Sequence, residues 1–68
     1  MKYEVIIWWS EDDQSYLAEI PELPGCVADG KSHPELLRNL EEVTQLWLDT
    51  AKLENRPIPA PRGRLQYA

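Results

Sequence analysis

The sequence predicts an α+β domain with the element order β-β-β-α-β, in which one long helix packs on one face of a small antiparallel sheet. Three short segments rich in β-branched and aromatic residues, separated by turn residues, lie within residues 3–29, and one stretch of helical period follows them. A chain of 68 residues is long enough for one domain, residues 1–68. Domains this small bury only about 60% of their unfolded surface, so we expect a homo-oligomer, either a dimer or a tetramer.

The first strand is predicted over residues 3–9, YEVIIWW, where alternation places Val5 and Ile7 on one face and Ile6 and Trp8 on the other. The polar turn SEDDQS joins it to a second strand, residues 15–20, so that the two form an antiparallel hairpin. A third strand over residues 26–29 ends at Gly30. After the extended, proline-rich RPIPAP segment, a short last strand is predicted over residues 63–67.

The helix is predicted over residues 33–53. Ser32 and Glu35 form a capping-box pattern at its start, and Asn55 is a suitable stop. Its apolar residues recur at steps of four and three and form a predicted core stripe of Leu36, Leu40, Val43, Trp47 and Ala51. Leu46 and Leu53 widen this stripe beyond the arc that one small sheet covers. The excess apolar face is therefore either partly exposed or buried against a subunit or partner.

The charge is acidic but unevenly distributed. Residues 1–54 hold all twelve carboxylates against Lys2, Lys31, Arg38 and Lys52, a net charge of −8, whereas residues 55–68 hold three arginines and no acid. The acidic body would repel a nucleic-acid backbone and attract a basic partner. We find no signal-peptide pattern and no apolar run long enough to span a membrane, which predicts a cytoplasmic protein without a membrane partner.

Six residues are candidate partner contacts. The turn carboxylates Glu11, Asp12 and Asp13 would steer a basic partner, and Trp8, Leu46 and Leu53 would supply apolar contact. For these last three residues, burial in the core of the domain is the alternative.

No catalytic or metal-binding set is predicted. Cys26 is the only cysteine and His33 the only histidine, so we expect no catalytic residue, no metal ion and no cofactor. Cys26 is predicted to be a small buried residue and His33 an exposed one. A two-metal hydrolase would need carboxylates such as Glu4 and Glu42, both of which we predict to be surface groups, and the last strand offers none.

The segment PELPGCVADGKSHPEL resembles the pattern of the HicB-like antitoxin family, and the resemblance runs from about Tyr3 to Asn55. Leu36 follows Glu35 where the pattern usually has alanine. The matching residues are Pro21, Leu23, Pro24, Gly25, Cys26, Gly30 and Glu35.

The resemblance implies a partial ribonuclease-H-like fold without enzyme activity. It also implies a protein that neutralises a small basic ribonuclease toxin, HicA, by binding over it. Many members add a C-terminal DNA-binding module; this sequence ends at Ala68 without one, so we expect no direct DNA binding. Two alternatives remain: a stand-alone oligomeric domain that binds another ligand or protein, and, less favoured, a minimal ribonuclease-H-like hydrolase.

Overall fold

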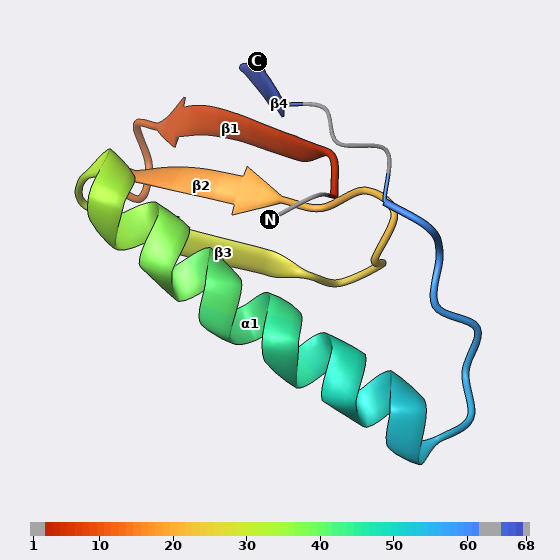
Figure 1. Cartoon of the computed structure of the whole chain (residues 1–68). Helices are drawn as coiled ribbons and strands as arrows, with labels where there is room; N and C mark the ends of the chain where they lie inside the picture. The colour runs from red at the N-terminus through yellow and green to blue at the C-terminus, as the bar shows by residue number, and fades with distance from the viewer. Residues whose placement is uncertain (1–2, 62–64, 68) are drawn as a thin grey trace.

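The computed structural model describes residues 3–61 and 65–67. Its elements follow the predicted order, and α1 has the predicted bounds (Figure 1). β1 begins two residues later than predicted and ends one residue later, β2 ends one residue earlier, and β3 begins and ends one residue later. Residues 63–64 of the predicted last strand lie outside the described residues. The elements are β1 (Val5–Ser10), β2 (Ser15–Glu19), β3 (Val27–Gly30), α1 (His33–Leu53) and β4 (Leu65–Tyr67).

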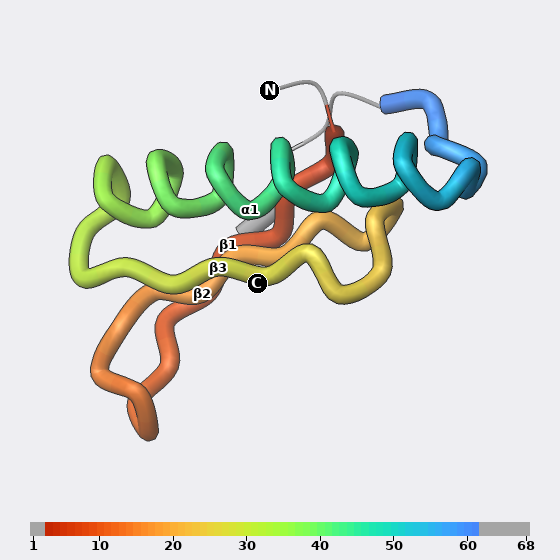
Figure 2. Tube along the Cα trace, turned by 90° about the horizontal axis from the view of Figure 1, so that it is seen from below, coloured from red at the N-terminus to blue at the C-terminus, as the bar shows by residue number. Residues whose placement is uncertain are grey.

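The four strands form one sheet in the order β3-β2-β1-β4. β1 and β2 pair antiparallel with Trp8 opposite Leu17, and β2 and β3 pair antiparallel with Leu17 opposite Asp29. β4 returns beside β1 and pairs with it in parallel. Figure 2 shows α1 as a separate layer on one side of the sheet, with the β1–β2 hairpin bending away from it. Among the described residues, no helix covers the opposite face of the sheet.

The core lies between α1 and the sheet and follows the predicted alternation. Leu36 and Leu40 are fully buried and Ala51 nearly so, whereas Val43 and Trp47 are only partly buried. Thr44 is also buried, and its hydroxyl is satisfied there because it donates to the Leu40 carbonyl at 2.7 Å. The core cluster contains Val5, Ile7, Ala18, Ile20, Leu23, Cys26, Ala28, Leu36 and Leu40.

Both ends of α1 are capped as predicted. The Ser32 hydroxyl accepts a hydrogen bond from the Glu35 amide at 3.3 Å. Asn55 follows the helix with φ of 55°, the left-handed conformation that terminates many helices, and the Arg56 amide then donates to the Ala51 carbonyl at 2.8 Å.

The prediction that Glu4 is a surface group is wrong. Glu4 is only 7% exposed, because the chain entering β1 passes the β2–β3 connection, where the Glu4 amide donates to Oε1 of Glu22 at 2.7 Å. Glu42 is exposed on α1, as predicted. The two carboxylates that a hydrolase would need therefore lie in different environments, one buried beside the sheet and one on the outer helix surface.

Candidate functional site

The Pro-x-Leu-Pro-Gly-Cys segment folds into a closed corner between β2 and β3. The Leu23 amide donates to the Ile20 carbonyl, the Cys26 amide donates to the Leu23 carbonyl, and the Ile20 amide donates to the Cys26 carbonyl, at 2.9–3.0 Å. Gly25 has φ of +84°, a conformation that other residues rarely adopt. The motif therefore has a conformational role in turning the chain.

The same corner anchors the helix to the sheet. Leu23 and Cys26 are buried, which confirms the prediction for the cysteine, and the Cys26 sulfur lies 3.5 Å from the Thr44 hydroxyl. The indole Nε1 of Trp47 donates to the Pro24 carbonyl at 2.8 Å. These contacts make the motif a structural joint. Its remaining members, Pro21, Gly30 and Glu35, lie at the start of the corner, the end of β3 and the first turn of α1.

Replacing Trp47 with phenylalanine tests this joint. The change keeps an aromatic ring on α1 but removes the donor to the Pro24 carbonyl, so we expect the free energy of unfolding to fall by about 1 kcal/mol. Urea denaturation followed by circular dichroism measures the loss. A Trp9→Phe variant, which changes a 43%-exposed indole at the end of β1, is the control. Equal losses in the two variants would contradict a specific role for the hydrogen bond.

The six predicted partner contacts fall on two separate parts of the molecule. Trp8 lies on β1, and the acidic turn that follows it is exposed at the tip of the hairpin. Leu46 and Leu53 are 67% and 85% exposed on α1, so they do not belong to the core. The hairpin tip bends away from α1, so the acidic turn lies apart from the helix that carries the two leucines (Figure 2).

The sheet face opposite α1 brings the candidate contact Trp8 together with residues of β2 and β3 that were not predicted as contacts. Along each strand, alternate side chains point away from the buried core, and on β1, β2 and β3 these are apolar or acidic except for Ser10 and Ser15 beside the hairpin turn. Leu17, Val27 and Asp29 could have been identified from their alternation with Ala18 and Ala28, which are buried. We call this surface the open sheet face, comprising Ile6, Trp8, Leu17, Glu19, Val27 and Asp29.

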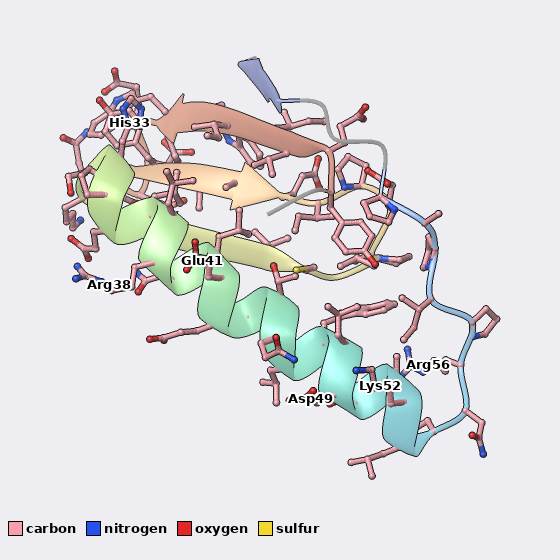
Figure 3. The ribbon with its side chains drawn as sticks, viewed as in Figure 1. His33, Arg38, Glu41, Asp49, Lys52 and Arg56 are labelled. Carbon is pink, nitrogen blue, oxygen red and sulfur yellow. The ribbon has the colours of Figure 1, made fainter. Side chains whose placement is uncertain are left out.

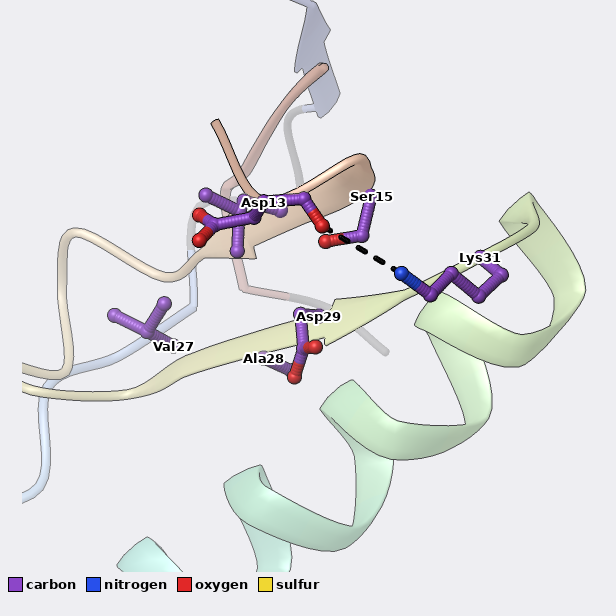
Figure 4. Close-up of a pocket in the computed structure, with 7 residues that line it drawn as sticks. Asp13, Ser15, Val27, Ala28, Asp29 and Lys31 are labelled. Carbon is purple, nitrogen blue, oxygen red and sulfur yellow. Dashed lines mark hydrogen bonds between the residues drawn. The ribbon is translucent and has the colours of Figure 1, made fainter. Parts of the chain in front are cut away.

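A shallow hollow of about 340 Å³ lies at one end of the open sheet face, against the hairpin turn (Figure 4). The Lys31 ammonium donates to the Gln14 carbonyl at 3.0 Å and lies 3.5 Å from the Asp13 carbonyl, so it ties the end of β3 to the turn. The hollow is lined by Asp13, Ser15, Leu17, Val27, Ala28, Asp29 and Lys31.

An aromatic cluster occupies the other side of the hairpin. The rings of Trp9 and Tyr16 meet edge to face with centroids 4.9 Å apart, and Tyr16 lies 4.5 Å from the ring of His33 at the start of α1. His33 is exposed, as predicted. Within the residues that the structure describes, no three His, Cys, Asp or Glu side chains form a group able to hold a metal ion.

The helix is amphipathic along its whole length. Arg38, Asp49 and Lys52 lie along its exposed side (Figure 3). In the described part of the chain, no helix is both long and apolar enough to cross a membrane.

Fold and surface together define a small α+β domain built around a Pro-x-Leu-Pro-Gly-Cys corner, in which no helix of the described residues covers the second face of the sheet. The chain belongs to the UPF0150-like family, whose model matches residues 2–59.

Curated relatives carry the same family name, and their names state no activity, ligand or partner. UPF0150 protein Ta0767 of Thermoplasma acidophilum is 41% identical over 59 residues, which are 87% of this chain and 84% of the relative. UPF0150 protein ssl0259 of Synechocystis is 38% identical over 60 residues, 88% of this chain and 81% of the relative. No solved structure matches the chain.

Proposed function

We propose that this protein is a non-catalytic, HicB-like antitoxin of the cytoplasm, which binds and neutralises a small basic HicA-like ribonuclease. The observation that carries the proposal is the open sheet face, where apolar side chains and carboxylates lie together on a strongly acidic body. The resemblance of residues 21–36 to the HicB-like pattern supplies the class of partner.

Electrostatics and packing support different steps of this binding. The net charge of −8 on residues 1–54 would accelerate the encounter with a basic protein. The carboxylates at the hairpin tip would contribute most to this attraction. Trp8, partly exposed on the open sheet face, would then supply aromatic contact area, the kind of residue that carries much of the binding energy in interfaces. Neither step needs a catalytic group.

The test is a calorimetric titration of the full chain with a catalytically inactive HicA-like protein from the same genome, carried out at low and at high salt. We expect a dissociation constant of about 100 nM or tighter, as for specific interfaces of standard size, and weaker binding at higher salt. Active toxin should lose its ribonuclease activity at equimolar ratio. The proposal would be overturned if the two proteins did not bind, or if the ribonuclease activity of the equimolar mixture equalled that of the toxin alone.

Charge reversal of the hairpin tip sharpens the test. We expect the Glu11→Lys/Asp12→Lys variant to slow association about tenfold, because these exposed carboxylates steer the encounter. Asp13 is left unchanged because its amide and carboxylate bond the Ser10 hydroxyl within the turn. The matched control is Glu41→Lys/Glu42→Lys on the exposed side of α1, which makes the same change of charge. An equal slowing in the control would show that only net charge matters.

A second candidate function is that of a stand-alone oligomeric domain. The observation that favours it is the pair Leu46 and Leu53, which lie two helical turns apart on the outside of α1 and are both largely exposed. Light scattering decides whether the protein alone is a dimer or a tetramer. A stable oligomer that binds no HicA-like toxin would favour this candidate.

A further inference from the structure

We propose that the open sheet face is the docking surface for the basic partner and that an arginine side chain of the partner inserts into the hollow between Asp13 and Asp29. This inference rests on the proposed function, because it names the surface and the anchoring chemistry of that same interaction. It follows from the strand register, the free carboxylate at the hollow and the apolar wall beside it.

The strand register places an aromatic, an aliphatic and an acidic side chain in one row across three strands. Trp8 on β1 lies opposite Leu17 on β2, and Leu17 lies opposite Asp29 on β3. In the next row, Glu19 lies opposite Val27, which is 45% exposed at the sheet edge. A partner lying across this face therefore meets apolar contact area beside carboxylates that face solvent.

The carboxylates at the hollow are available to a cation. In the described part of the chain, no side chain or amide bonds the Asp29 carboxylate; only the backbone carbonyl of Asp29 is engaged, accepting from Asn39 at 2.8 Å. The Asp13 carboxylate accepts one hydrogen bond, from the Ser10 hydroxyl at 3.0 Å. Lys31 is turned to the backbone carbonyls of the hairpin (Figure 4), and no ion pair among the described residues joins it to either carboxylate.

An arginine matches these features better than other side chains. Its aliphatic stem would pack against Leu17 and Val27, and its planar guanidinium would donate to carboxylate oxygens, where charge-assisted hydrogen bonds are the strong ones. The exposed side of α1 is a poorer receptor for a basic protein, because Arg38 and Lys52 lie among its carboxylates, whereas the one ammonium at the hollow, that of Lys31, is held by the Gln14 carbonyl. Charge complementarity therefore favours the open sheet face as the contact with the basic partner.

The first experiment locates the cation site without the toxin. Amide resonances of the ¹⁵N-labelled full chain are followed by NMR during titration with N-acetylarginine amide, and N-acetylcitrulline amide serves as a neutral probe of the same shape. We expect arginine-dependent shifts concentrated on residues of the hollow. Shifts spread evenly over all exposed acidic positions, or equal shifts with citrulline, would overturn the proposed site.

The second experiment uses the inactive HicA-like protein and two variants that each remove one exposed carboxylate. We expect Asp29→Asn to weaken toxin binding about tenfold or more, as loss of one partner of an interfacial charge pair does. Glu42→Gln, the matched change on α1, should weaken it by less than about twofold. Both positions are exposed and isosterically replaced, so circular dichroism should show unchanged folding.

The outcomes separate the inference from the proposed function. If the toxin binds tightly and Asp29→Asn leaves its affinity unchanged, or Glu42→Gln weakens it more than Asp29→Asn does, the proposed docking surface is wrong. The antitoxin proposal then stays in place. Arginine-specific shifts at the hollow together with no toxin binding support the cation site and overturn the antitoxin proposal. Localised shifts with selective loss in Asp29→Asn support both.

Discussion

Replacing Leu40 with alanine is expected to lower the free energy of unfolding by about 3 kcal/mol, within the usual range for a fully buried leucine. Leu40 is 0% exposed and lies in the core between α1 and the sheet. The truncation removes apolar contact and leaves a cavity, which the short strands beside it cannot fill without moving. In a domain of 68 residues this loss is a large share of the total stability.

The loss is measured by urea denaturation at one fixed protein concentration, because self-association would make stability depend on concentration. Leu46→Ala is the matched control, since the same atoms are removed from a residue of the same helix that is 67% exposed. We expect that variant to lose less than about 0.5 kcal/mol in the monomer. A Leu46 effect as large as the Leu40 effect would mean that Leu46 is buried in an oligomer, which light scattering on the same samples would reveal.

Gly30→Ala is expected to destabilise the protein by about 2–3 kcal/mol, the cost typical of an overpacked site. A Cβ atom at Gly30 would lie 2.6 Å from the Leu36 amide nitrogen and 2.8 Å from the Leu36 Cα. Both are backbone atoms in the first turns of α1, so relief requires a shift of the helix relative to β3. The end of β3 is thus also the point at which the strand and α1 approach each other closely.

Gly25→Ala is the control for Gly30→Ala, because it separates the steric cost of an added Cβ atom from the cost of a backbone conformation that alanine disfavours. A Cβ at Gly25 would meet nothing within 4 Å, so only its φ of +84° disfavours alanine, at a cost of about 1 kcal/mol. Urea unfolding of both variants gives the comparison. If Gly30→Ala lost no more stability than Gly25→Ala, the close approach of β3 to α1 would not be the constraint at Gly30.

The open sheet face and the outer side of α1 carry different predicted contacts, and their compositions suggest different partners. The open sheet face combines apolar residues with free carboxylates and suits a basic protein. The outer side of α1 combines charges of both signs with the exposed Leu46 and Leu53, and exposed apolar side chains of this kind are candidates for contact with a second copy of the chain. If each surface serves one partner, an oligomer would still present its acidic faces to a basic protein.

The sequence by itself determined the local structure of this protein. The bounds of α1 followed from Ser32, the apolar period and Asn55, because caps and helical spacing act within a few residues of the chain. The order of the strands along the chain followed for the same reason. The buried role of Cys26 was also predicted, from its residue type.

Only the tertiary structure decided which surfaces exist. Alternation assigned Ile6 and Trp8 to one face of β1 but could not say which face α1 would cover, because that choice depends on contacts between distant segments. The burial of Glu4 beside Glu22 and the close approach at Gly30 have the same origin. Asp13, in the hairpin turn, and Asp29, on β3, line one hollow because β2 and β3 pair. No local sequence pattern encodes this arrangement.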